Sequence, residues 1–200
     1  MCGRFLLKSG LENLAARYNA DYSEDLYKSG EIFPSENALA VVKSDGRIRL
    51  LPMKWGFPMS GNKRLIINAR IETADKKPMF KFALMKRRCL IPANAFFEWK
   101  AGQGNKVKHL IGKNEEEIFS MAAIYDEGTF VILTMDSSEK MKSIHERMPL
   151  ILTREEENIW LDDKADLSML KSVMGASRFV DLNIEPLAGK EEYTLFDFIE

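Results

Sequence analysis

The residue with the most distinctive chemistry in this sequence is Cys2, which directly follows the initiator methionine. Removal of that methionine gives Cys2 an α-amine with a pKa of about 7.7–8.0 beside a thiol with a pKa of about 8.5. The thiolate is the nucleophilic form. An aldehyde that meets this aminothiol first forms an imine at nitrogen, and the thiol then closes a five-membered thiazolidine. A cysteine at position 2 also occurs by accident, so this assignment needs support from other residues.

Three further residues suit the proton transfers and hydrogen bonds that imine chemistry needs. Glu98 lies among aromatic residues, and a carboxylic acid there could protonate the leaving hydroxyl of a carbinolamine. His145 is one of two histidines, and histidine is the side chain best suited to moving protons near neutral pH. Asn68 has an amide that donates and accepts at once. The alternatives are a solvent-facing glutamate, a structural histidine and an ordinary asparagine at the end of a strand.

Length and composition predict one domain over residues 1–200. The chain has 46% apolar and 30% charged residues, which is typical of a globular protein. No apolar run approaches the roughly 20 residues of a membrane span, and no signal peptide opens the chain, so we expect a cytoplasmic protein. Cys2 and Cys89 are expected to remain free thiols. Two cysteines and two histidines give no metal-binding spacing, and we expect no cofactor.

The overall charge of the chain is not typical of a nucleic-acid-binding protein. The net charge is −1 and the pI is about 6.2, whereas basic domains are the usual footprint of nucleic-acid binding. Six cations do cluster between residues 76 and 88. They are interpreted either as a solvated helix face or as a strip that contacts phosphates. The composition therefore argues against long tracts of non-specific DNA binding and leaves room for a small site.

Local patterns predict an α+β single domain with a mixed, barrel-like β-sheet core flanked by short helices. The expected strands cover residues 38–42, 47–53, 65–69, 89–99, 107–111, 117–125, 129–135, 150–152 and 178–184. Residues 44–46 read as a hairpin turn, and residues 107–135 as a meander. The expected helices start at capping boxes 9–12 and 153–156 and also cover residues 138–144 and 167–174.

Four motifs in this order resemble the signature of the SOS response-associated peptidase (SRAP) family. They are Met1-Cys2-Gly3-Arg4-Phe5, residues 68–73, residues 96–100 and residues 145–149. The resemblance implies the SRAP fold and a sensor of abasic sites in single-stranded DNA. It further implies that Cys2 forms a covalent thiazolidine crosslink with the ring-opened abasic deoxyribose and so protects the site. Autocatalytic removal of Met1 and a possible lyase activity belong to the same expectation.

The resemblance also implies roles for individual residues. Cys2, Asn68, Glu98 and His145 are the expected catalytic residues. The expected DNA-binding residues are Arg4, Pro34, Trp55, Arg70, Trp99 and Arg147. For Trp55, stacking on an unpaired base and packing in the core remain equal alternatives. The expected partner is single-stranded DNA with abasic sites, bound by a monomer that does not associate with membranes and is nucleoid-associated when on DNA.

The sequence departs from the family pattern at Glu31. Family members commonly carry asparagine three residues before a proline, whereas this chain has Glu31 and Pro34. A carboxylate there is expected to repel phosphate. The acidic segment 181–200 also matches the family poorly.

Two other functions remain open from the sequence. The first is a cysteine hydrolase that uses Cys2, His145 and Glu98 on a peptide or amide and needs the thiol without a free amine. The second is a non-catalytic module that binds nucleic acid or protein, in which the four motifs serve packing.

Overall fold

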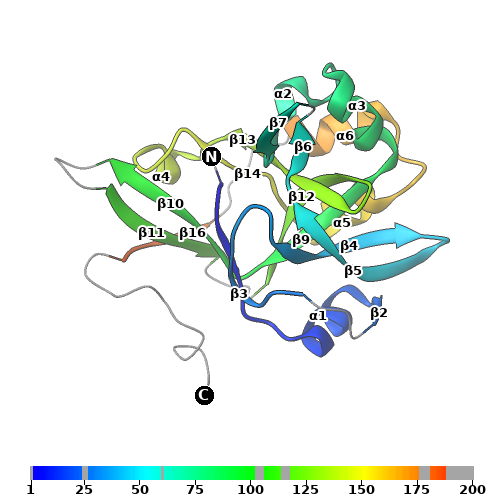
Figure 1. The fold of residues 1–200 in the computed structure, drawn as a ribbon, viewed down its shortest axis with the longest axis horizontal. Helices are drawn as coiled ribbons and strands as arrows, with labels where there is room; N and C mark the ends of the chain where they lie inside the picture. Colours follow the sequence, from blue (N-terminus) through cyan, green and yellow to red (C-terminus); the bar gives the residue numbers. More distant parts are fainter. Residues whose placement is uncertain are drawn as a thin grey trace.

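The computed structural model describes residues 2–23, 27–59, 61–101, 106–113, 118–175 and 181–187. They form two β-sheets, a separate hairpin and short helices (Figure 1). The smaller sheet has the strand order β16 (Leu182–Pro186), β11 (Lys106–Lys113), β10 (Ala95–Ala101), β1 (Phe5–Leu7) and β3 (Gly30–Ile32). The predicted terminal strand is thus confirmed only in part, since residues 178–180 and the acidic residues 188–200 lie outside the described chain.

The larger sheet contains nine strands. Its main path is β14 (Arg147–Pro149), β13 (Thr129–Asp136), β12 (Phe119–Asp126), β9 (Arg88–Ala93), β4 (Asn37–Ser44), β5 (Arg47–Trp55) and β2 (Asp21–Tyr22). Two short strands join this path: β15 (Ile151–Leu152) pairs with β12, and β8 (Asn68–Arg70) pairs with β13. The hairpin consists of β6 (Phe57–Met59) and β7 (Asn62–Ile66).

The larger sheet closes into a ring. Strand β13 pairs with β12 on one side and also with β5, in parallel, through Phe130 and Trp55. The strands β13, β12, β9, β4 and β5 therefore form a closed circuit of hydrogen-bonded neighbours. This confirms the predicted mixed, barrel-like sheet. The predicted hairpin is also confirmed, because β4 and β5 pair in antiparallel register from Ser44 and Arg47 outward.

Trp55 packs in the core where the two sheets meet. Its ring lies 5.2 Å from the ring of Phe5 in β1 and stacks on Phe130 at 6.2 Å, measured between ring centroids. All three side chains are fully buried. The indole N–H donates to the backbone carbonyl of Ile67 at 2.9 Å, so its polar atom is satisfied. The first strand of the chain is thereby anchored against the ring-shaped sheet.

The helices are α1 (Leu11–Tyr18), α2 (Ile71–Ala74), α3 (Pro78–Lys86), α4 (Glu139–Lys142), α5 (Arg154–Leu161) and α6 (Leu167–Gly175). The predicted capping box of Thr153 and Glu156 at α5 is confirmed. The capping box predicted for α1 is wrong, because Gly10 is its N-cap and Ser9 instead accepts a hydrogen bond from Asn94. Within the described ranges, no helix is long and apolar enough to cross a membrane.

The strand predicted over residues 89–99 is in fact two strands in different sheets. Strand β9 ends at Ala93 and β10 begins at Ala95. Asn94 between them accepts a hydrogen bond from the Lys8 amide at 2.7 Å, which fixes the change of sheet. The predicted meander is confirmed only in part: β12 pairs with β13, but β11 pairs with β10 and β16 and not with β12. The switch places Glu98 in the sheet that contains β1.

We predict that Gly56→Ala destabilises the fold by about 2–5 kcal/mol, the sum of backbone strain and overpacking. Gly56 has φ near +119°, and a Cβ there would lie 2.9 Å from the Cβ of Leu65. Urea unfolding measures the loss. The control is Gly46→Ala, where φ is +76° but nothing lies within 4 Å; it should lose only about 1–2 kcal/mol. Equal losses for the two variants would contradict the packing argument.

Candidate active site at the N-terminal cysteine

Strand β1 brings the N-terminal residues to the edge of β10. Phe5 pairs with Phe96 of β10 on one side and with Ile32 of β3 on the other. The Phe97 amide donates to the Arg4 carbonyl at 2.9 Å, so the hydrogen bonding continues toward Cys2. Residues alternate between the two faces of a strand, and Glu98 therefore shares a face with Phe96. Both side chains are buried.

The thiol of Cys2 is fully buried. Burial first, and the negative charge of Glu98 second, raise the pKa of this thiol to about 12. Its Sγ lies 3.8 Å from the Arg4 carbonyl oxygen, to which the thiol donates. The thiol therefore keeps its proton at neutral pH. A reaction at sulfur requires a proton acceptor. The Glu98 carboxylate is a candidate, because its charge already influences the pKa of this thiol. Both Cys2 and Cys89 are free thiols, as predicted.

Asn68 holds the main chain of Cys2. Its Nδ2 donates to the Cys2 carbonyl oxygen at 2.8 Å, which fixes the orientation of the amide because a carbonyl can only accept. The Oδ1 atom is buried and has no hydrogen-bond partner among the described residues. An acceptor in this position suits an N–H or O–H donor of a substrate or of the cysteine amine. Strand β8 presents Asn68 through its parallel pairing with β13.

His145 follows α4 and lies just before β14. Its backbone amide donates to Met141, and its Nδ1 accepts from the Arg147 amide at 3.0 Å. In the neutral ring this hydrogen bond leaves the proton on Nε2, so Nε2 is a donor. Figure 1 shows α4 and β14 on the side where the N-terminus lies. Cys2 is joined to Asn68 by a hydrogen bond and to Glu98 by charge, whereas His145 lies in the loop between α4 and β14.

The guanidinium of Arg147 already makes hydrogen bonds and ion pairs within the protein. Its guanidinium donates to Glu72 at 2.7 Å, to Asp136 at 2.5 Å and to the Thr134 carbonyl at 2.6 Å. Its side chain is only 11% exposed, and it fastens α2 to β13 and β14. A phosphate would have to compete with two carboxylates for this arginine. Arg70, by contrast, is exposed at the end of β8.

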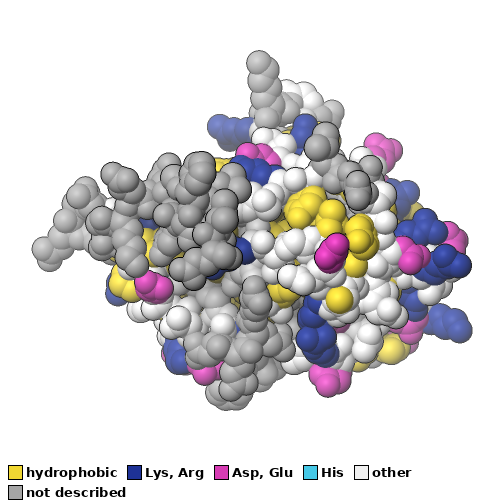
Figure 2. Space-filling model, turned by 90° about the horizontal axis from the view of Figure 1, so that it is seen from below, with side chains coloured by type: hydrophobic (Ala, Val, Ile, Leu, Met, Phe, Trp, Pro, Cys, Tyr) yellow, Lys and Arg dark blue, Asp and Glu magenta, His cyan; other side chains and the backbone are white. Residues whose placement is uncertain are grey.

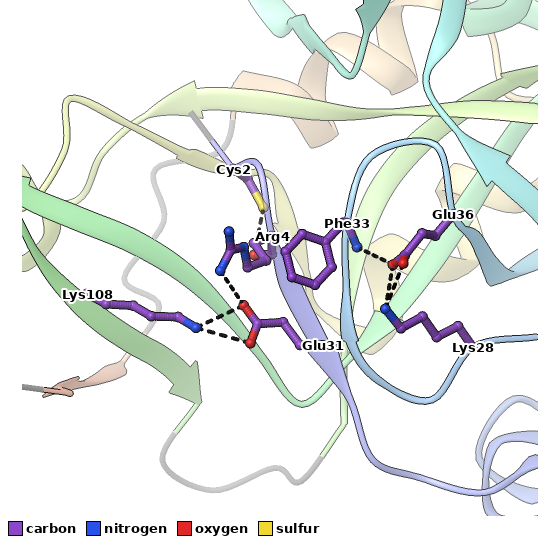
Figure 3. A network of polar contacts seen from close by, with 7 residues as sticks. All are labelled: Cys2, Arg4, Lys28, Glu31, Phe33, Glu36 and Lys108. Atoms are coloured by element: carbon purple, nitrogen blue, oxygen red, sulfur yellow. Dashed lines mark hydrogen bonds and ion pairs between the residues drawn. The ribbon is translucent and has the colours of Figure 1, made fainter. Parts of the chain in front are cut away.

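Arg4 belongs to a cluster of charges and aromatic rings next to Cys2 (Figure 3). Its guanidinium carbon lies 4.2 Å from the ring centroid of Phe33 and 4.9 Å from that of Trp99. Its Nη1 donates to Glu31 at 2.9 Å, and Lys108 donates to the same carboxylate. Glu31 is therefore neutralised by two cations, which its position in the sequence alone did not indicate.

Pro34 is half-buried in the turn that follows β3. Lys108 and Phe33 were missed by sequence reasoning. Lys108 faces Trp99 across β10 and β11, and only that pairing would have indicated its place.

The remaining aromatic and basic candidates divide between core and surface. Trp55 is fully buried, so it packs in the core as the alternative interpretation had it and offers no face to a base. Arg88 is buried and donates to the Trp160 and Asp162 carbonyls, while Arg87 pairs with Asp126. The four lysines of the basic cluster are exposed: Lys76, Lys77, Lys81 and Lys86. On the face shown in Figure 2, acidic and basic side chains are interspersed.

Comparison with known proteins identifies the family. A sequence model described as SOS response associated peptidase (SRAP) matches residues 1–188. The chain belongs to the SRAP family. It is 34% identical to the abasic site processing protein YoqW of Bacillus subtilis, over 87% of this chain and 86% of that protein. It is 30% identical to the abasic site processing protein YedK of Escherichia coli, with 80% and 79% covered.

The fold matches a solved crystal structure over nearly its whole length. A crystal structure of a protein from Bacteroides thetaiotaomicron superposes with a TM-score of 0.82 at 26% identity. The superposition covers 94% of this chain and 93% of the other. The family is thus confirmed by the sequence comparisons, and the predicted α+β fold by the structure.

We predict that Glu98→Gln lowers the pKa of the Cys2 thiol, because it removes a negative charge that opposes the thiolate. A titration of the rate of thiol alkylation, which is proportional to the thiolate fraction at any pH below the pKa, measures the change. The titration uses a Cys89→Ala background, and circular dichroism confirms that both proteins stay folded. An unchanged or higher pKa in the Glu98→Gln protein would show that the carboxylate does not act on this sulfur.

Proposed function

We propose that this SRAP protein senses abasic sites in single-stranded DNA and crosslinks to them through Cys2. The observation that carries the proposal is the arrangement of one cysteine, one carboxylate and one amide around the second residue of the chain. Asn68 contacts the Cys2 main chain, and the charge of Glu98 reaches its thiol. The names of relatives in Bacillus subtilis and Escherichia coli, abasic site processing proteins, support the same substrate.

The reaction begins once Met1 has been removed, which we assign to the same site as an autopeptidase step. The free α-amine attacks the aldehyde of the ring-opened deoxyribose and gives a carbinolamine. The Glu98 carboxylate accepts the thiol proton and then donates it to the leaving hydroxyl, which departs as water and leaves an iminium. The thiolate attacks the iminium carbon, and Glu98 is again a carboxylate. The products are a thiazolidine and one water, and Glu98 ends as it began.

Asn68 and His145 position the reacting groups in this scheme. The free Oδ1 of Asn68 accepts from the amine or from a sugar hydroxyl and so directs the nitrogen lone pair toward the aldehyde. His145 offers its Nε2–H to the ring oxygen of the closed sugar, which favours the open aldehyde form. By microscopic reversibility the same contacts act on release of the adduct, and a lyase step would use the same iminium.

Single-stranded DNA is the proposed partner because the sugar must reach a buried N-terminal residue. Extruding a nucleotide from a duplex costs unpairing and unstacking energy, which a single strand does not require. The exposed Arg70 and the half-buried Trp99 are the groups we assign to the strand on either side of Asn68 and Glu98. We propose that the protein acts as a monomer in the cytoplasm and on the nucleoid.

The cysteine hydrolase alternative fits the site less well. Cysteine hydrolases use a thiolate whose pKa is lowered by an adjacent histidine cation. Here the pKa of the thiol is raised to about 12, and its charged neighbour is a carboxylate. The Nδ1 of His145 is also occupied by the Arg147 amide.

We predict that the wild-type protein forms a heat-stable adduct with single-stranded abasic DNA and that Cys2→Ser forms only a borohydride-reducible imine. The serine keeps the α-amine but its hydroxyl is too weak a nucleophile to close the ring. Intact-mass spectrometry reports loss of Met1 and the mass of each adduct. A stable, unreduced adduct of the Cys2→Ser protein would contradict the thiazolidine, and retention of Met1 in the crosslinked wild-type protein would contradict the amine.

We predict that Glu98→Gln slows crosslink formation by about 10²–10⁴-fold, the usual cost of removing a positioned acid. Single-turnover rates of crosslinking measure the loss, and equilibrium binding of a tetrahydrofuran abasic analogue, which has no aldehyde, should stay near the wild-type value. The control is Glu157→Gln, which removes the charge of a buried glutamate that pairs with Arg17; it should lower the melting temperature and leave the crosslinking rate unchanged. Equal rates for Glu98→Gln and wild type would remove Glu98 from the mechanism.

A further inference from the structure

The carboxylate of Glu31 is shared between two cations beside the active site (Figure 3). Its Oε1 accepts from Nη1 of Arg4 at 2.9 Å and from Nζ of Lys108 at 2.9 Å, and its Oε2 accepts from the same Nζ at 3.0 Å. The side chains are 25%, 17% and 11% exposed for Arg4, Lys108 and Glu31. One anionic oxygen that bridges an arginine and a lysine is the arrangement in which a DNA phosphate oxygen would also bind.

The two cations are held in place by aromatic rings as well as by Glu31. The guanidinium of Arg4 lies over the ring of Phe33 and over that of Trp99. The ammonium of Lys108 lies 4.3 Å from the ring centroid of Phe97, which is fully buried. Such cation–aromatic contacts are worth about 0.5–1 kcal/mol at exposed sites and more where water is excluded. Removal of the Glu31 charge therefore leaves two positioned donors, not two mobile side chains.

Arg4 connects this cluster to the reacting cysteine. Its carbonyl oxygen accepts from the Cys2 thiol at 3.8 Å and from the Phe97 amide at 2.9 Å. A phosphate bound by the Arg4 guanidinium would thus belong to a nucleotide very near the abasic sugar.

We infer that Glu31 is an internal counter-ion that occupies a phosphate position formed by Arg4 and Lys108, and that it lowers the affinity for undamaged single strands. This inference rests on the proposed function. A DNA phosphate must displace the carboxylate or share its cations with it, and this cost applies to every strand that binds. An abasic strand that reacts becomes covalently held, so its capture does not depend on equilibrium affinity alone. Glu31 is therefore a specificity-determining residue.

The opposite role would be that Glu31 orients Arg4 for DNA binding. The two roles predict changes of opposite sign when the charge is removed. If Glu31 only orients Arg4, Glu31→Gln weakens binding to any strand. If it competes with phosphate, the same change strengthens binding and adds phosphate contacts.

The test measures binding of an undamaged fluorescent single strand over a series of salt concentrations. We expect Glu31→Gln to bind several-fold tighter than wild type. The slope of log K against log salt should become steeper by about 0.7 for one added phosphate contact and about 1.4 for two. The double variant Glu31→Gln with Lys108→Met should lose at least half of the added slope.

The matched control is Glu36→Gln, which removes the same charge from the neighbouring turn. Glu36 pairs with Lys28 and accepts from the Phe33 amide, and within the described part of the chain it makes no hydrogen bond or ion pair with Arg4 or Lys108. It should keep the wild-type slope. Weaker binding by Glu31→Gln, an unchanged slope, or the same slope in both single variants would overturn the inference.

A separate measurement keeps the proposed function distinguishable. The wild-type protein and Glu31→Gln are each incubated with abasic single-stranded DNA, and the crosslink is quantified. Failure of the wild type to crosslink would overturn the proposed function, whereas the salt slopes on undamaged DNA decide the role of Glu31 in either case.

Discussion

The packing of Phe5 against Trp55 is the contact on which the geometry of the site depends. Chain termini are normally the least ordered part of a domain. Here the first strand is paired on both sides, and the Phe5 ring lies 5.2 Å from an indole that is itself stacked and hydrogen-bonded. Only Gly3 and Arg4 separate Cys2 from this anchor, so the reach of Cys2 is limited to about 3.3–3.6 Å per residue. The core of the protein therefore positions Cys2.

Sequence patterns correctly predicted the turns and caps that depend only on neighbouring residues. The turn at Asp45 and Gly46 and the capping box at Thr153 needed only neighbouring residues, and both formed as predicted. The errors arose where a residue far away in the sequence formed a hydrogen bond that replaced the expected local one. Ser9 did not cap α1 because its hydroxyl binds Asn94, and Asn94 in turn ended a strand that apolar alternation alone would have continued. Such contacts over about 85 positions leave no periodic signal in the sequence.

The candidate site was predictable in its residue types but not in its contacts. Cys2 and Glu98 carry chemistry that can be read from their identity and surroundings in the sequence. The contacts of Arg147, Trp55 and Glu31 depend on strand register. Arg147 faces Asp136 across β13 and β14, and Lys108 reaches Glu31 because it lies opposite Trp99. The type of a residue determines which hydrogen bonds and ion pairs its side chain can make. The strand register determines which of these are already made within the protein.

The two carboxylates beside Cys2 act in the same direction on the proposed reaction. The charge of Glu98 opposes ionisation of the thiol, and Glu31 occupies the donors of Arg4 and Lys108. In the proposed reaction, neither the nucleophilicity of the thiol nor the phosphate affinity of the two cations is fully expressed until a substrate binds. Glu98 would then transfer protons to and from the aldehyde adduct, and a phosphate would offer the two cations a second anion. For a chain with a net charge of −1, recognition then follows from a chemical group that undamaged DNA lacks, and a strongly basic surface would only add binding to every other strand.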